Sequence, residues 1–360
     1  MIGTRLKIAR AAARLSLRDL AERMESLVSA QMIGRYERNE ATPGPAVLAA
    51  LTVALDISEA YLTKKGPERL ESVEFRRSGF STKKEERGIE AVVLDEIGRN
   101  LAIEDILGIA GPTWKLPEGV SLSVADAGGA EDAARQVRVA WSAGQENIPN
   151  LAEFLEDRGI RVLNIKLPSQ VSGLAAWIRV KDAPAAPIIV VNSMHTGERQ
   201  RLTLSHEAGH LLIECADPKD EETLAYRFGS AFLMPAHRVR AELGERRQAL
   251  AVGELIEAKR LFGVSAQALA YRCKDLEIIS QANYRQLFDS FEKLGWRSPP
   301  YSEPNPVPKE LSRRFHRLCF RALSEGLISD TRAADLLQIS VLQLDQEIFP
   351  EHGESKTLQG

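Results

Sequence analysis

The chain has 360 residues, of which 44% are hydrophobic and 27% are charged, and its formal net charge is −3. This composition is that of a globular protein with room for two or three domains, and it excludes wholesale disorder and a uniformly basic chain. No apolar run approaches the roughly 18 residues that a membrane span needs, and we expect no signal peptide and no membrane partner. The three scattered cysteines suit a reducing compartment, so we expect a soluble cytoplasmic protein.

Residues 1 to about 65 have the pattern of several short helices. Ser16 and Asp19 are spaced as a capping box at the start of one helix, and Ser29 can cap the next. Asn39 suits the left-handed position at the end of that second helix, before a segment rich in proline. Two short consecutive helices, with the second exposed, are what a helix-turn-helix domain places in the major groove of DNA.

The second helix carries side chains that can recognise base edges. Ile33 and Tyr36 are spaced to face a small core. The opposite face carries the residues that we expect to point toward DNA: Ala30, Gln31, Gly34 and Arg35. Glutamine can bond adenine and arginine can bond guanine through two hydrogen bonds. The side chains that suit phosphate contacts, which fix position but not sequence, are Ser29, Arg18 and Arg38.

The local charge agrees with a DNA-binding surface. The first 39 residues contain eight basic and four acidic side chains, a charge of +4 within a chain of −3. Periodicity alone leaves open a small helical domain that binds protein or dimerises. The first 62 residues, with SLRDLAE, IGRYERN and a final ISEAYL in order, resemble the lambda-repressor/Cro-like helix-turn-helix family. That resemblance implies double-stranded operator DNA as partner, with contacts from Ser29, Ala30, Gln31 and Arg35.

Such a domain contacts one half-site, so we expect a homodimer on two half-sites about one helical turn apart. The segment 71–107 has helical apolar spacing that could pair in this dimer.

The middle of the chain changes period. We interpret 67–130 as a helical linker region. Between residues 160 and 192, three short β-rich runs separated by Pro, Gly, Ser and Asp predict a small antiparallel sheet. A helix then runs from about Glu198 to Glu214, and a second begins near Glu221 and stops at Pro235.

The first of these helices contains His206-Glu207-Ala208-Gly209-His210, the HExxH pattern. Residues four apart lie on one face of a helix, so His206 and His210 can point nitrogens at one Zn²⁺. Glu207 can then act as general base toward a zinc-bound water and can protonate the leaving amine. Chance and two ordinary helix histidines are the competing interpretations, but an apolar helix after a sheet is the context that the motif needs.

A third protein ligand is required, and the sequence leaves five candidates open: Glu214, Asp217, Asp220, Glu221 and Glu222. The residues from about 130 to 275 resemble the ImmA/IrrE family of metallopeptidases, because HExxH is followed by a helix with E-x-x-A-x-x-F and then LMP. The resemblance implies that Glu222 is the third ligand. The sequence departs from the family pattern at three positions. Tyr226 stands where Asn is usual, Gly229 where Ala is usual, and Glu214 where His is common.

Other histidines are weaker candidates. His195, in a loop ahead of the HExxH helix, could approach a substrate, and His237 could stabilise an oxyanion. An ordinary surface role is the simpler interpretation of both. A segment near Asp330 looks faintly like a second helix-turn-helix, and we interpret it as a packing module.

Together these features predict an α+β protein with an all-α helix-turn-helix domain at 1–66, the linker at 67–130, a zincin-like domain at 131–280 and a helical region at 281–360. We expect a DNA-binding regulator whose zinc endopeptidase domain cleaves a protein, which the resemblance suggests is a repressor or an antitoxin in a stress or toxin–antitoxin response. The alternative is a transcription factor or antitoxin-like repressor that uses the zincin fold as a non-catalytic sensor or scaffold.

Overall fold

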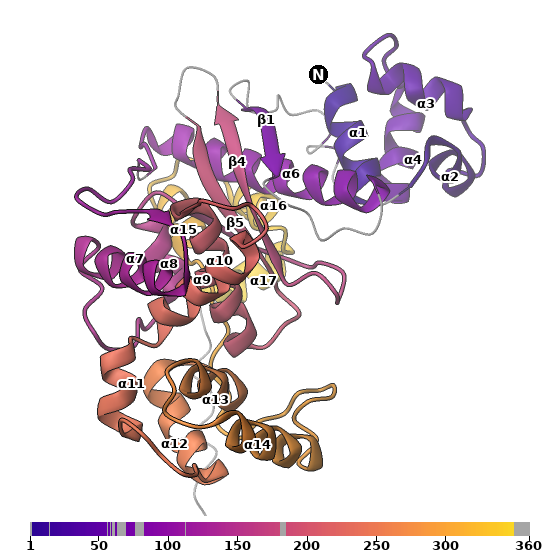
Figure 1. Ribbon diagram of the computed structural model, residues 1–360. Helices are drawn as coiled ribbons and strands as arrows, with labels where there is room; N and C mark the ends of the chain where they lie inside the picture. The colour runs from indigo at the N-terminus through magenta and orange to yellow at the C-terminus, as the bar shows by residue number, and fades with distance from the viewer. Residues whose placement is uncertain are drawn as a thin grey trace, which may run out of the picture. The chain divides into compact units, whose positions relative to one another are not determined.

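The computed structural model describes residues 2–348 except 14, 56, 58, 60, 61, 63–69, 76–82, 112 and 181–184. The chain divides into two compact units. Figure 1 labels their helices and strands. The first comprises Met1–Leu70, Ser81–Gly111 and Arg313–Gly360, and the second comprises Glu71–Phe80 and Pro112–Ser312. Helices separate from a small sheet confirm the α+β class. None of the described helices is long and apolar enough to cross a membrane.

The N-terminal part of the first unit holds four short helices: α1 (Ile2–Ala12), α2 (Leu17–Arg23), α3 (Ala30–Glu37) and α4 (Pro45–Leu55). Their shared core is apolar and fully buried at Leu6, Leu20, Ile33, Leu51 and Leu62. The hydrophobic effect therefore holds the four helices together as one small domain.

Predicted caps begin and end the helices of this domain. Ser16 Oγ accepts from the N–H of Asp19 at 3.1 Å, and the Asp19 carboxylate accepts from the N–H of Ser16 at 2.7 Å, which confirms the capping box. Ser29 Oγ accepts from the N–H of Met32 at the start of α3. Asn39 follows α3 with φ of 58°, in the left-handed region that the sequence indicated.

The remaining helices of the first unit are α6 (Lys83–Leu107), α15 (Arg314–Ser324), α16 (Asp330–Leu337) and α17 (Val341–Ile348). They share a core that includes Ile103 and Leu344. Polar contacts add to it, since Arg99 donates to the carbonyl of Leu336 at 2.7 Å. The segment near Asp330 thus packs within its own unit.

The structure differs from the expectation of an apolar dimer face at 71–107. Residues Leu70–Phe75 form strand β1 and not a helix, and 76–82 lie outside the described residues. On α6, Ile89, Val93 and Ile97 are buried, and the helix contacts α1 and α15 of the same unit. The apolar spacing of this helix is therefore explained by packing inside one chain.

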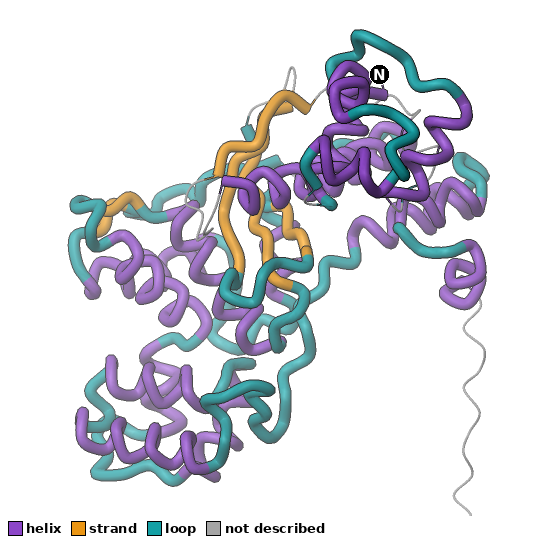
Figure 2. The backbone as a smooth tube through the Cα atoms, turned by 90° about the vertical axis from the view of Figure 1, so that its right-hand side faces the viewer, coloured by secondary structure: helices purple, strands orange, loops and turns teal. Residues whose placement is uncertain are grey.

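The second unit contains a four-stranded sheet in the order β1-β4-β5-β3, with β3 (Arg161–Ile165), β4 (Gly173–Val180) and β5 (Ala186–Asn192) (Figure 2). The strand β4 is antiparallel to β5, as expected, but β3 is parallel to β5, so the sheet is mixed. Every residue of β5 from Pro187 onward is buried, and the strand is flanked by β4 on one side and β3 on the other. A run of this kind indicates a central strand but not the direction of its neighbours.

Two helices pack directly against this sheet: α9 (Gly197–Leu212) contacts β4 and β5, and α8 (Leu151–Glu156) contacts β3. Two further helices, α7 (Ala127–Ala140) and α10 (Glu221–Leu233), lie beyond them. The helix α10 packs against both α9 and α7. The helix α9 ends at Leu212, two residues earlier than expected, and Glu214–Cys215 forms a short strand, β6, that pairs in parallel with β2 (Ser123–Val124). Glu214 is thereby directed away from the helical face that carries the histidines.

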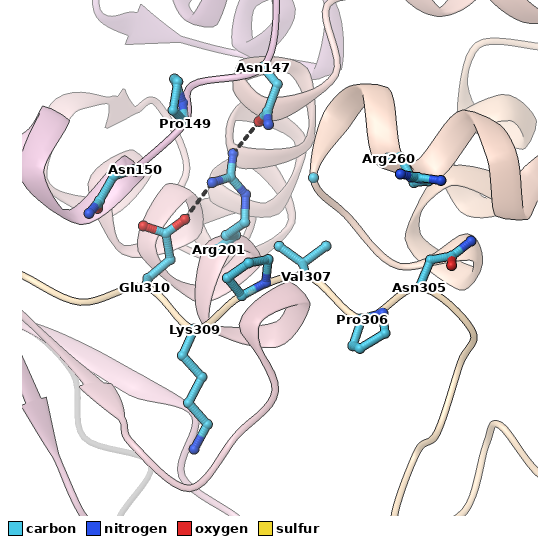
Figure 3. A pocket seen from close by; sticks show the side chains of 12 residues that line it. Asn147, Pro149, Asn150, Arg201, Arg260, Asn305, Pro306, Val307, Lys309 and Glu310 are labelled. Atoms are coloured by element: carbon cyan, nitrogen blue, oxygen red, sulfur yellow. Dashed lines mark hydrogen bonds and ion pairs between the residues drawn. The ribbon is translucent and has the colours of Figure 1, made fainter. Parts of the chain in front are cut away.

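Four further helices complete the second unit: α11 (Ala236–Leu243), α12 (Val252–Phe262), α13 (Ala266–Asp275) and α14 (Gln281–Lys293). After them an extended segment, 303–312, returns to the beginning of α9. Arg201 of α9 forms a buried ion pair with Glu310 and donates to Asn147 at 2.6 Å (Figure 3). A cavity of about 560 Å³ lies beside this pair. These contacts fix the first turns of α9.

Candidate functional site

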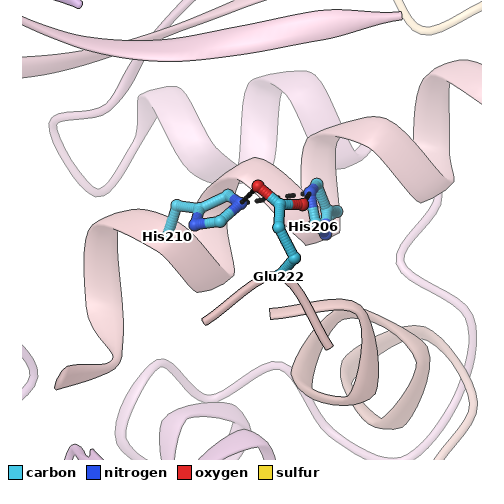
Figure 4. A group of neighbouring side chains, drawn as sticks. All are labelled: His206, His210 and Glu222. Atoms are coloured by element: carbon cyan, nitrogen blue, oxygen red, sulfur yellow. Dashed lines mark hydrogen bonds and ion pairs between the residues drawn. The ribbon is translucent and has the colours of Figure 1, made fainter. Parts of the chain in front are cut away.

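The HExxH residues lie on α9, at the centre of the second unit. His206 and His210 are one turn apart, with exposed fractions of 7% and 6%, and their Nε2 atoms lie 3.1 Å apart. Figure 4 shows both rings turned toward one point, which Glu222 approaches from α10. Helical periodicity alone accounts for the histidine pair.

Two glycines allow α10 to come close enough for Glu222 to reach the histidines. A Cβ atom on Gly209 would lie 3.1 Å from the carbonyl oxygen of Ala225, and one on Gly229 would lie 2.9 Å from the backbone nitrogen of His206. Both are closer than ordinary van der Waals contact between a side chain and a backbone. The small residues therefore set the distance between the helices that carry the three side chains.

The three side chains have the spacing of ligands around one ion. The Glu222 carboxylate lies 3.4 Å from each histidine Nε2 atom, and one donor atom from each of the three residues lies within 4.8 Å of the others. Ligand atoms at about 2.0–2.1 Å from a tetrahedral ion are about 3.3–3.4 Å apart. Two imidazoles and a carboxylate are also a common donor set for such ions. The residues present therefore fit a metal, and Glu222 is the one acid of the five candidates that meets both histidines.

The neighbouring acid, Glu221, has a different position. Its carboxylate lies 3.1 Å from Nδ1 of His210, on the side of the ring away from the other two ligands. An acceptor there keeps the proton on Nδ1 and leaves Nε2 with a free lone pair. The sequence placed Glu221 among the candidate ligands, and nothing in its spacing distinguished this supporting position.

His206 has no such acceptor among the described residues, since its buried Nδ1 atom lacks a hydrogen-bond partner. Instead, the ring of Tyr226 lies against its imidazole, with ring centroids 3.9 Å apart and a 30° angle between planes. The departure from the usual Asn at this position therefore has a consequence: packing, and not a hydrogen bond, orients this histidine.

Glu207 points into the unit beside the histidines and is 9% exposed. Burial raises the pKa of its carboxyl group to about 8, with a further contribution from the charge of Glu222, while a hydrogen bond with the backbone of Ala175 on β4 opposes the shift. Burial, together with His210, lowers the pKa of His206 to about 3, so its ring is neutral. A neutral imidazole is the form that binds a metal.

A cavity of about 260 Å³ opens beside these groups. His206, Glu207 and Tyr226 line one side, and the segment Gln170–Gly173, which leads into β4, lines another. A small open space bordered by a carboxylate of raised pKa and by one histidine of a candidate metal cluster is a common form of a catalytic site.

The other sequence candidates lie elsewhere. Asp217 is exposed and accepts from the N–H of Lys219, and Asp220 precedes α10. His195 is half-buried, with its Nε2 atom 3.2 Å from the carbonyl of Ser169, and His237 is exposed. None of the four borders the cavity.

The helix α3 presents the predicted DNA-facing side chains. Gln31 and Arg35 are exposed, while Ile33 and Tyr36 are buried as expected. Gly34 differs from the expectation because it is buried: a Cβ atom there would lie 3.4 Å from Leu17 of α2. This glycine therefore supports the close packing of the two helices and does not face outward.

The phosphate-contact candidates are all on the surface. Arg18, Ser29 and Arg38 are exposed, and Ala30 is half-buried. The guanidinium of Arg38 bonds both oxygens of Glu40, at 2.7 and 3.0 Å. This ion pair is exposed, and such pairs contribute little to stability, so phosphate can replace the carboxylate at small cost.

Comparison with known families supports the two domains that carry these candidate sites. Residues 6–62 match the helix-turn-helix family, and residues 155–274 match the family of IrrE N-terminal-like domains, Peptidase_M78. The chain thus carries a helix-turn-helix domain fused to an IrrE-type peptidase domain, which confirms both resemblances. The first match supports binding to double-stranded DNA, and the second, which spans α9 and α10, supports a metal at the site. A comparison with curated proteins found no match.

Proposed function

We propose that the chain is a DNA-binding regulator whose second unit is a zinc-dependent endopeptidase. The observation that carries the proposal is the convergence of His206, His210 and Glu222 beside a buried Glu207 at an open cavity. Two imidazoles and one carboxylate favour zinc over magnesium, which prefers oxygen ligands.

The three ligands would hold the ion and leave one position for water. Bound zinc supplies a Lewis acid that lowers the pKa of a water molecule. Glu207 would be the general base of the site: its carboxylate would accept a proton and would return it to the leaving amine of the peptide. A bound cation would oppose the burial that raises the pKa of the Glu207 carboxyl group and would favour its ionised form. Glu221 keeps His210 in the required tautomer.

In the first unit, we propose that Gln31 and Arg35 contact bases, while Arg18, Ser29 and Arg38 contact phosphates. Their exposure on α3 and around it supports these roles. We propose a repressor or an antitoxin as the substrate, which is what the resemblance to the ImmA/IrrE family implies. The substrate can also be another copy of this chain. A homodimer would place two such domains on two half-sites.

Glu207→Gln tests the enzyme, because amide replaces carboxylate without changing the size of the side chain. We expect zinc content, measured by mass spectrometry, to stay at one per chain, and cleavage of helix-turn-helix repressors or of the chain itself to disappear. DNA binding should persist. The matched control His206→Ala should lose zinc as well as cleavage.

These measurements separate two interpretations of the second unit: a zinc-dependent peptidase, and a zinc-binding scaffold without catalytic activity. Purified protein that neither contains nor takes up zinc would contradict both an enzyme and a zinc scaffold. A Glu207→Gln protein that cleaves and regulates normally would contradict the enzyme alone.

A further inference from the structure

The cavity beside Glu207 contains a cationic group that the proposed peptide hydrolysis does not use. Arg199 is exposed and is the one Lys or Arg among the ten residues that line the cavity. It precedes His206 by seven residues on α9, so the two lie on nearly the same face, about 10.5 Å apart along the helix axis.

One edge of the Arg199 guanidinium is held in place. Its Nε and Nη2 atoms lie 3.2 and 2.9 Å from Ser172 Oγ, in the segment that leads into β4. The group is thus tied to the cavity wall from two elements of the same unit, α9 and the start of β4. A guanidinium has five N–H groups, so the outer edge keeps two parallel donors for another partner.

No carboxylate of the described residues lies within ion-pair distance of Arg199. The neighbouring arginine on the same helix, Arg201, is neutralised by Glu310, and Arg227 on α10 pairs with both Glu131 and Asp275. The cavity therefore presents an oriented guanidinium that forms no direct ion pair with a carboxylate of the described residues. Parallel N–H donors of this kind match the two oxygens of a carboxylate.

We propose that Arg199 determines substrate specificity by binding a carboxylate of the substrate, close to the bond that is cut. This inference rests on the proposed peptidase function. An extended peptide advances about 3.3 Å per residue, so the 10.5 Å along α9 corresponds to about three residues. The carboxylate is then an Asp or Glu side chain within three residues of the cleaved bond, or the C-terminal carboxylate of a short peptide.

Peptide hydroxamates test this without turnover, because the hydroxamate binds the metal and the peptide lies in the cavity. Each probe carries Glu at the first, second or third residue from the hydroxamate, and its matched partner carries Gln. A separate pair of probes carries Gln and differs only at the C-terminus, which is a free carboxylate in one probe and an amide in the other. This pair distinguishes a side-chain carboxylate from a C-terminal one. Affinities are measured by calorimetry on the full-length zinc-loaded chain.

For at least one position we expect about a 5- to 10-fold preference for the carboxylate over its neutral partner. Arg199→Gln should reduce the ratio of the two affinities to about one. Arg199→Glu should reverse the charge preference, so that a probe with Lys at the same position binds more tightly than the Glu probe. Arg135→Glu is the matched control, since it makes the same charge change on α7 at an exposed arginine outside the cavity. It should keep the preference.

The failures are distinguishable. A chain with zinc that binds Glu and Gln probes equally at all positions, or that binds neither, would overturn the role of Arg199 and leave the metal site intact. A preference that survives in Arg199→Glu would also overturn it. A chain without zinc would overturn the peptidase and, with it, this proposal.

Discussion

The Cα atom of Gly229 faces the backbone of His206 so closely that a Cβ atom would lie 2.9 Å from the His206 nitrogen. This contact between α10 and α9 sets the position of Glu222, one of the three converging side chains, relative to the two histidines.

Gly229→Ala should therefore push α10 away from α9. We expect the free energy of unfolding to fall by about 1–3 kcal/mol, as for other overpacked sites, and zinc affinity to fall with it. Urea unfolding and competition with a zinc chelator measure the two effects. Gly253→Ala on α12 is the control, because its Cβ would meet nothing within 4 Å, and alanine there should be neutral or stabilising. Equal zinc affinity in both variants would contradict this packing argument.

Glu221→Gln removes the negative charge behind His210. Because the carboxylate holds the Nδ1 proton of that ligand, we expect zinc affinity to fall about 10- to 100-fold without loss of the fold. The same competition assay measures it. Glu214→Gln should have no effect, since Glu214 lies on β6. If the Glu214 variant lost zinc instead, the assignment of the ligand helix would be wrong.

Arg201 and Glu310 are 2% and 3% exposed in their side chains and form one ion pair. Removing either partner leaves a buried charge, so Arg201→Met or Glu310→Met should lower the free energy of unfolding of the second unit by about 3–5 kcal/mol. The double variant should recover much of this loss, because no charge is left alone. Arg135→Met, which breaks an exposed pair, should change stability by less than about 1 kcal/mol. Additive losses in the double variant would show that the two side chains do not act as a pair.

The DNA contacts separate into two kinds. Gln31→Ala and Arg35→Ala should each weaken binding to the preferred site by about 1–3 kcal/mol and broaden its sequence preference. Arg18→Ala should weaken binding to all DNA sequences alike, because it removes a phosphate contact. The number of counterions released on binding, read from the salt dependence of the affinity, should fall by about one. Fluorescence anisotropy over a range of salt concentrations, on fragments upstream of the gene itself, measures both. Arg285→Ala, on α14, is the control, and a complete lack of salt-dependent binding would contradict the assignment.

Much of both sites is local in sequence, and this part was predictable. The spacing of His206 and His210 places them on one face of any helix, and the caps at Ser16 and Ser29 need only the residues three positions further on. Family resemblance added Glu222 to the histidine pair, and the geometry agrees with it.

The tertiary structure decided what depends on contacts between distant segments. Glu214 is nearer to His210 in sequence than Glu222 is, yet pairing of β6 with β2 takes it away, while close contact at Gly209 and Gly229 brings Glu222 in. The apolar face of α6 packs against neighbouring helices within its own unit. The strand β3 runs parallel to β5. Helical periodicity and capping act within a few residues of the chain, so the sequence alone determined them. Which helices and strands meet is set by packing across the whole unit, and only the folded structure shows it.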